Sequence, residues 1–238
     1  MMSERARMAL SHSRLSDYNQ CPKKFWHKYI NKTPSFKEEE GKSPHLVRGS
    51  NVHKALENYI IKKSAGEVGI RESSLPEVET TKPLIDSMFT AYPSVLPEAQ
   101  VSINDQWKQV EWFSKESYYR AIFDMICIRT EDIIIGDFKT GKFRDYTPET
   151  GYGQLEMSAA IALSLWPEIP EVHTVYIYVD HKKTVKKTFN QGDRVELVQW
   201  FDNEHAKVNA DEEFKPKVNE HCKWCPATKL QCPYSRKL

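Results

Sequence analysis

The sequence predicts an α/β fold, because stretches with strand periodicity alternate along the chain with stretches of helical periodicity. Residues 118–142 (YYRAIFDMICIRTEDIIIGDFKTGK) predict two strands joined by a short polar turn, and 172–180 and 182–190 predict two more. Apolar residues at helical spacing predict helices at 48–63, 148–166 and 193–210. A chain of 238 residues can bury one substantial core, so we expect residues 1–238 to form a single domain.

Composition restricts the expected partners and compartment. The 34 basic and 33 acidic residues leave a net charge of +1, so any contact with DNA must come from local clustering. No stretch reaches the roughly 18 apolar residues of a membrane span, and MMSERARMALSHS lacks the apolar core of a signal peptide. We therefore expect a soluble, cytoplasmic protein with no membrane partner.

The two central strands carry the first candidate site. Strand alternation places Asp137 and Lys139 on one face, and it places Asp124 on the same face as Ile122 and Ile126. A charge among such neighbours is costly unless it is paired or binds a metal. Two acids and a lysine at the ends of paired strands predict a divalent-cation site that faces a phosphate or water. The alternative is a structural salt bridge between Asp137 and Lys139.

The order of these residues carries a resemblance. Asp124, followed after an isoleucine run by Asp137-Phe138-Lys139 in GDFKTGK, resembles the PD-(D/E)XK nucleases in their RecB-like form. The resemblance implies a restriction-endonuclease-like core at about 46–210, with a mixed sheet from strands in 98–139 and 172–189 flanked by helices. It also implies that Asp124, Asp137 and the Phe138 carbonyl bind the cation, while Lys139 orients the attacking water and stabilises charge at the phosphate.

A histidine in the helix at 48–63 is a further candidate ligand. His53 and Glu57 lie one turn apart in this helix, which Ser50 or Asn51 can cap. A lone helical histidine is more often structural than a ligand. Gly49-x3-His53-x3-Glu57, however, resembles the histidine motif of the family, which implies that His53 binds the cation. Because an imidazole ligand suits Mn²⁺ better than Mg²⁺, we expect Mn²⁺ or Mg²⁺ with a preference for manganese.

A glutamine opens the helix that follows the central strands. Thr147 and Pro148 predict the start of this helix, which continues to Trp166, and Gln154 lies near that start. The alternative interpretation is that Gln154 is a solvent-exposed residue without a functional role. The resemblance instead implies that Gln154 positions the catalytic lysine and the DNA backbone. The family commonly has a tyrosine four residues later, where this chain has Ser158.

The segments before the central strands are less informative. Residues 31–45 and 64–80 predict loops, and 81–94 predict a short helix that ends at its prolines. The pattern over 98–113 predicts an antiparallel hairpin with its turn near Asn104 and Asp105. The family often has an acidic residue before this hairpin. Glu98 matches that position only loosely, so the sequence assigns it no role.

Four of the five cysteines predict a metal or cluster site. In a reducing compartment, cysteines at these spacings favour metal ligation over disulfides, and Cys127, inside a strand, is the buried exception. The distant Cys21 and the C-x2-C-x6-C arrangement can bind zinc or an iron–sulfur cluster, and spacing alone does not decide between them. The arrangement consists of Cys222, Cys225 and Cys232.

A second resemblance favours the cluster. The pattern Ser-x4-Tyr-x2-Cys-Pro-x2-Phe, which begins at Ser13, resembles the entry segment of the iron–sulfur branch of RecB-like nucleases, including the CRISPR-associated exonucleases. It implies a 4Fe–4S cluster that ties the segment at 13–30 to the segment at 218–235. Binding of the cluster contributes folding free energy.

Basic residues after the central strands are candidates for DNA contact. Lysines on an edge strand are more often a protection against sheet-to-sheet aggregation, which is the alternative interpretation for those at 182–187. Because a net charge of +1 gives no broad positive field, we expect a narrow groove that favours one strand over two. The candidates are Lys142, Arg144, Lys182, Lys183, Lys186 and Lys187.

Together these features predict a metal-dependent DNA exonuclease that acts on single-stranded ends in DNA processing, recombination or repair. A helicase, recombination or CRISPR partner is compatible with this prediction. The alternatives are a non-catalytic DNA-binding or assembly subunit of a helicase or recombination complex, and an endonuclease of the same fold. The presence of His53, Asp124, Asp137 and Lys139 speaks against the non-catalytic subunit.

Overall fold

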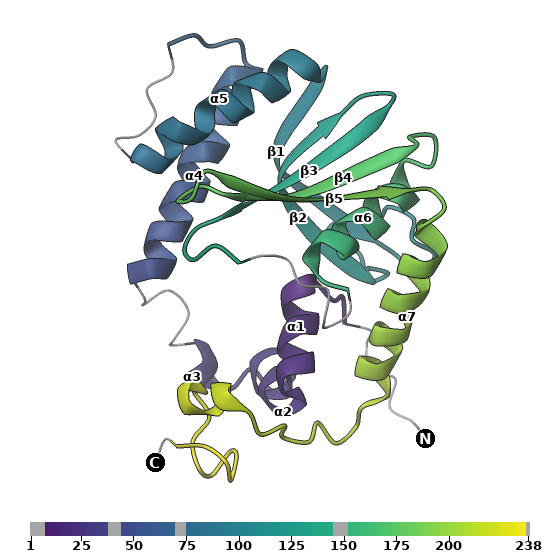
Figure 1. The fold of residues 1–238 in the computed structure, drawn as a ribbon. Coiled ribbons are helices and arrows are strands. Elements are labelled where there is room, and N and C mark those ends of the chain that lie inside the picture. Colours follow the sequence, from purple (N-terminus) through teal and green to yellow (C-terminus); the bar gives the residue numbers. More distant parts are fainter. Residues whose placement is uncertain (1–7, 38–43, 70–74, 145–151, 237–238) are drawn as a thin grey trace.

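A five-stranded mixed sheet forms the centre of the molecule (Figure 1). The computed structural model describes residues 8–37, 44–69, 75–144 and 152–236. The strands are β1 (Ser94–Ile103), β2 (Tyr119–Ile128), β3 (Asp132–Lys139), β4 (Glu171–Tyr178) and β5 (Lys183–Asn190), in that order across the sheet. All neighbours are antiparallel except β3 and β4, whose parallel pairing requires the crossover helix α6 (Gln154–Leu165). The predicted mixed α/β fold is confirmed.

Helices cover both faces of the sheet. Neighbouring residues of β2, Ile126 and Cys127, belong to two separate core clusters, because successive strand residues point to opposite faces. The larger cluster includes residues of α1 (His12–Gln20), α6 and α7 (Arg194–Ala210). The smaller one includes residues of α4 (Pro44–Ser64) and α5 (Pro76–Ala91). Among the described helices, none combines the length and apolarity needed to cross a bilayer.

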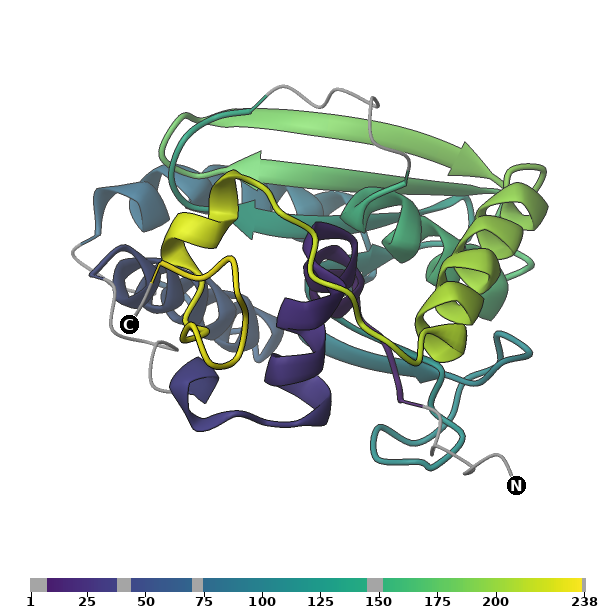
Figure 2. The same cartoon turned by 90° about the horizontal axis from the view of Figure 1, so that it is seen from below.

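The C-terminal segment packs beside α1, which lies near the other end of the sequence. Short helices α2 (Pro22–Phe25), η1 (Trp26–Ile30) and α3 (Pro34–Lys37) follow α1, and η2 (Glu220–Trp224) lies in the C-terminal segment. The side-chain amide of Asn219 donates to the Gln20 carbonyl at 2.9 Å, and Lys217 Nζ donates to the Asn19 carbonyl at 3.0 Å. Figure 2 shows the C-terminal segment running past α1.

Two helices begin earlier than their sequence patterns predict. Helix α4 starts at Pro44, so Ser50 and Asn51 lie inside it and do not cap it. Helix α5 starts at Pro76 and continues through Pro83, which the prediction treated as a helix-ending residue. Proline is well tolerated in a first helical turn, and the buried stripe on α5, which includes Ile85, holds the helix together past Pro83.

The hairpin predicted over 98–113 forms only in part: the chain turns at Asn104 and Asp105 and one antiparallel bridge joins Ile103 to Gln109, but no second strand follows. Strand β1 ends at Ile103, and its hydrogen-bonded neighbour is β2. Residues 104–118 fold into a loop in which the Asn104 side chain accepts hydrogen bonds from the amides of Gln106 and Lys108, both at 3.0 Å. The Trp107 side chain is buried beneath this loop and anchors it to the larger core cluster. The hydrogen bonds of the Asn104 side chain and the burial of the Trp107 indole therefore favour a loop over a second strand at 106–113.

The sheet forks between β2 and β3. These strands pair only over Met125–Ile128 and Ile133–Gly136, whereas β2 stays paired with β1 to Tyr119 and β3 stays paired with β4 to Lys139. Residues 119–124 of β2 and 137–139 of β3 therefore diverge, and we call this region the fork. At its far end Leu10 pairs with the free edge of β2, where its carbonyl accepts from the Arg120 amide at 2.8 Å.

Candidate active site

Asp124 lies at the start of the fork, on a face different from the predicted one. Phe123 and Ile126 belong to the same core cluster although regular alternation over three residues would put them on opposite faces. The alternation of β2 therefore shifts by one residue at this point. Asp124 faces α4, where its Oδ2 atom lies 3.4 Å from His53 Nδ1, so the prediction that it shares a face with Ile126 is wrong.

The same shift occurs in β1 at Glu98. The pairs Pro97–Met125 and Ala99–Phe123 flank this position, so Glu98 lies opposite Asp124 in unchanged register. Its φ of 45° lies in the left-handed region, which is unfavourable for a glutamate inside a strand. Two like charges on opposed strand residues also repel each other. Both costs are understandable if the two carboxylates share a cation.

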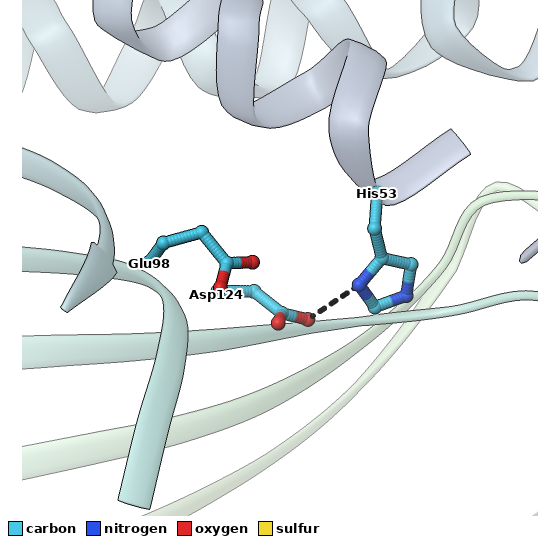
Figure 3. A group of neighbouring side chains, drawn as sticks. All are labelled: His53, Glu98 and Asp124. Carbon is cyan, nitrogen blue, oxygen red and sulfur yellow. Dashed lines mark ion pairs between the residues drawn. The ribbon is translucent and has the colours of Figure 1, made fainter. Parts of the chain in front are cut away.

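His53, Glu98 and Asp124 form a compact group of ligands. Their ligand atoms all lie within 4.8 Å of one another, and Figure 3 shows the three side chains converging from α4, β1 and β2. Ligand atoms on opposite sides of a cation with bonds of about 2.1 Å are about 4.2 Å apart, so the group fits a Mg²⁺- or Mn²⁺-sized ion after small movements.

The electrostatics of the group also fit a cation. Burial raises the pKa of Glu98, and the negative charge of Asp124 raises it further. The hydrogen bond with Asp124 raises the pKa of His53 against the opposing effect of burial, and a hydrogen bond to the Phe138 backbone adds to the increase. A bound divalent cation would take the place of the proton on His53 and remove the repulsion between the carboxylates.

A second group lies on the other side of β3. Lys139 Nζ is 2.6 Å from Asp137 Oδ2, which confirms that these two side chains share a face. Gln154, at the first turn of α6, accepts from Lys139 Nζ at 2.9 Å and donates through Nε2 to Asp137 Oδ1. Burial is the main cause that raises the pKa of Asp137, while the positive charge of Lys139 opposes it. Lys139 also lies 4.7 Å from the centre of the Tyr176 ring.

The backbone of Phe138 joins the two groups. Its amide donates to Asp124 Oδ2 at 2.7 Å, and its buried ring meets the His53 ring edge-on with centroids 6.2 Å apart. The structure therefore brings together His53, Asp124 and the backbone of Phe138. Asp137 bonds to Lys139 and Gln154 and does not belong to the three-residue ligand group.

The comparisons with known proteins identify the family. A family model described as the PD-(D/E)XK nuclease superfamily matches residues 9–233. The chain belongs to the PD-(D/E)XK nuclease superfamily. Membership in this superfamily implies metal-dependent nuclease activity and DNA binding. A solved structure described as "Crystal structure of SSO0001" is similar at 16% identity and a TM-score of 0.46, with 99% of this chain and 90% of that chain covered. No curated protein sequence matches the chain.

Most of the predicted DNA-binding cations of this PD-(D/E)XK nuclease gather near the ends of β3 and β4. Lys183 Nζ lies 4.6 Å from the centre of the Phe143 ring, and the Tyr178 hydroxyl donates to the Arg144 carbonyl at 3.1 Å. These contacts bring Lys182 and Lys183 towards Lys142 and Arg144, all four of which are exposed.

The structure separates the other two lysines of β5. Lys187 forms an ion pair with Glu156, which is fully buried in α6. A buried carboxylate needs such a partner, so this lysine has a structural role and is not a free phosphate ligand. Lys186 is exposed and points to the opposite side of β5.

The four cysteines outside the sheet line one cavity. It lies between the α1–α2 junction and the C-terminal segment. The amides of Lys217 and Asn219 donate to the Sγ atoms of Cys21 and Cys222, both at 3.4 Å. Hydrogen bonds to sulfur are typical of thiolate ligands in iron–sulfur proteins. The four are Cys21, Cys222, Cys225 and Cys232.

The sequence analysis assigns no role to Glu98, whereas the structure places it among the candidate metal ligands. A substitution at Glu98 tests this placement. Glu98→Gln should weaken Mn²⁺ binding by about 10- to 100-fold, because it removes one of the charged oxygen ligands. Glu57→Gln is the matched control, since Glu57 also lies near Glu98 but forms an ion pair with Lys54. Calorimetric titration with MnCl₂ measures both affinities. Equal affinity in the two variants would exclude Glu98 as a ligand.

Proposed function

We propose that this PD-(D/E)XK nuclease is a DNA exonuclease that acts on single-stranded ends, with Mn²⁺ or Mg²⁺, in DNA processing, recombination or repair. One observation carries the proposal. At the fork, the ligand group of His53, Glu98 and Asp124 lies next to the group of Asp137, Lys139 and Gln154. A cation site beside a fixed ammonium group is what phosphodiester hydrolysis requires.

Each residue of the site has a proposed role. His53, Glu98, Asp124 and the Phe138 carbonyl would hold the cation, and Asp137 would complete its surroundings from the other side of β3. When bound, the cation supplies positive charge at the phosphate and makes water more acidic. Lys139 would orient the attacking water and stabilise the negative charge that develops on the phosphate.

Gln154 is proposed as a positioning residue. Its amide contacts both Asp137 and Lys139, so it fixes the side-chain conformations of the acid and the ammonium group together. A flexible lysine side chain would have to be ordered each time a phosphate is cleaved, at a cost in conformational entropy. The hydrogen bonds to Gln154 and Asp137 order it before the substrate binds. Gln154 thus links the first turn of α6 to the end of β3.

Two features support a single strand as the substrate. The net charge of +1 gives no broad positive surface for a duplex, whose binding depends on many phosphate contacts. The exposed candidates Lys142, Arg144, Lys182 and Lys183 are confined to the region beyond Lys139. A local cationic path suits one flexible strand that is led to the cation site.

We also propose that the four-cysteine cavity binds a 4Fe–4S cluster. Four thiols from two distant segments line the cavity, which is the number of ligands that such a cluster needs. The resemblance of the Cys21 segment to the iron–sulfur branch of RecB-like nucleases supports the cluster over zinc. The cluster would tie the α1–α2 junction to the C-terminal segment.

Digestion of linear and circular DNA tests the proposed function. The purified chain with Mn²⁺ should progressively shorten a linear single strand that carries an end label, and leave a closed circle of the same sequence intact. Both substrates are compared at one salt concentration, because binding depends strongly on salt. Equal cutting of the circle would make the enzyme an endonuclease. Failure to cut either form would reject nuclease action on DNA.

A further inference from the structure

A cavity next to Gln154 has no part in the chemistry described above. Its volume is about 410 Å³, which is in the size range of pockets for small ligands. It lies in the fork, between the segment 9–14, the free edge of β2 at 120–122 and the first turns of α6. The cavity therefore adjoins the candidate active site, because Gln154 lines it and contacts Lys139.

Two arginines give the cavity a positive charge that no carboxylate among its described lining residues balances. Arg14 and Arg120 both line it, no carboxylate does, and neither guanidinium forms an ion pair with a described residue. Burial lowers the pKa of Arg14, and the nearby positive charge of Arg120 lowers it further. The Nε atom of Arg120 is buried without a hydrogen-bond partner. Two guanidiniums held close together in this way are stabilised by an anion.

Short polar contacts hold both arginines in place. Arg14 Nη1 donates to the Ala9 carbonyl at 2.6 Å, and Arg120 Nη2 donates to Ser117 Oγ at 3.1 Å. Each guanidinium has five N–H donors, so these bonds leave donors available on both. The hydroxyls of Ser11 and Ser13, which are 3.1 Å apart, also line the cavity and add neutral donors.

Aromatic rings stand beside the cavity. The Arg120 guanidinium lies 5.5 Å from the centre of the Trp112 ring and 6.0 Å from that of Phe113. The Phe113 side chain is 86% exposed although it is large and apolar. Aromatic rings next to a cationic groove are the usual stacking surfaces for the bases of single strands.

We propose that this cavity binds a backbone phosphate of the single-stranded substrate, and that Phe113 stacks on a neighbouring base. The proposal rests on the proposed function and specifies how its substrate is held. Arg120 is four residues from Asp124 along β2, or about 13 Å, so one short oligonucleotide can reach both the cavity and the cation site. Two anchored phosphates would fix the position of the strand at the site of cleavage.

Binding without cleavage tests the proposal. A fluorescently labelled single-stranded oligonucleotide is titrated in EDTA, so that affinity is measured independently of the chemistry. Arg14→Gln and Arg120→Gln should each weaken binding about tenfold and reduce the slope of log K against log salt by about 0.7. Arg129→Gln is the matched control, because it removes an arginine at the opposite end of β2, where Arg129 pairs with Asp132. It should leave affinity nearly unchanged.

A third variant separates the phosphate site from a structural role. Ser13 is exposed on the first turn of α1 and lines the cavity, so Ser13→Asp should keep or raise the melting temperature while weakening binding at least as much as the arginine variants. Affinities equal to that of Arg129→Gln in all three variants, or no binding by the unchanged chain, would overturn the proposal. Weakened binding by a chain that does not cut DNA would support the cavity and reject the exonuclease.

Discussion

Lys139→Met should slow DNA cleavage by roughly 100- to 1,000-fold, the usual cost of removing one preorganised group that stabilises transition-state charge. The side chain is already held in place by Asp137 and Gln154, so its ammonium needs little rearrangement to meet the phosphate. Methionine keeps most of the volume of the lysine and removes only the charge. The rate is measured in single-turnover cleavage of an end-labelled single strand at saturating enzyme and Mn²⁺.

Two further variants serve as comparisons for Lys139→Met. Lys108→Met removes an exposed lysine from the loop between β1 and β2 and should cleave at the normal rate. Gln154→Ala should lose about tenfold, because it frees the lysine without removing it. A Lys139→Met protein that folds normally, as judged by its melting temperature, and still cleaves at the wild-type rate would remove Lys139 from the mechanism.

Strand periodicity predicts one half of the candidate site well. In β3 the alternation is regular, so the shared face of Asp137 and Lys139 follows directly from their spacing, and the ion pair confirms it. In β2 the same reasoning fails for Asp124. The alternation shifts there together with that of β1, where Glu98 adopts a φ of 45°. Predictions from residue alternation treat strands as regular. They therefore miss the irregularity that brings Glu98 and Asp124 together.

Buried ion pairs are a second feature that the sequence alone does not predict. Lys187 belongs to a row of lysines on β5, and nothing in that row distinguishes it from its exposed neighbours. The distinguishing signal lies elsewhere, in Glu156, the one charged residue of helix α6. Such a residue requires a cationic partner, but only the parallel crossover from β3 to β4 shows that β5 supplies it. Long-range pairs of this kind depend on topology.

The second large effect is expected at the cysteines. Protein purified without oxygen should contain about four irons per chain if the cavity binds a 4Fe–4S cluster. Cys225→Ser should lose the iron and loosen both terminal segments, because a bound metal centre contributes on the order of 10 kcal/mol to folding, the value known for structural zinc. Iron content, the melting temperature and limited proteolysis near α1 measure these changes.

Cys127→Ser is the control that separates cluster loss from general damage. Cys127 is fully buried in β2, where burial raises the pKa of its thiol to about 12, so it stays neutral and cannot act as a thiolate. This variant should keep its iron, and any loss of stability should come only from a buried hydroxyl. Iron retained in full by Cys225→Ser would contradict the ligand assignment. Stoichiometric zinc without iron in the unchanged protein would mean that the cavity binds the other metal, and the link between the two ends of the chain would then be a zinc site.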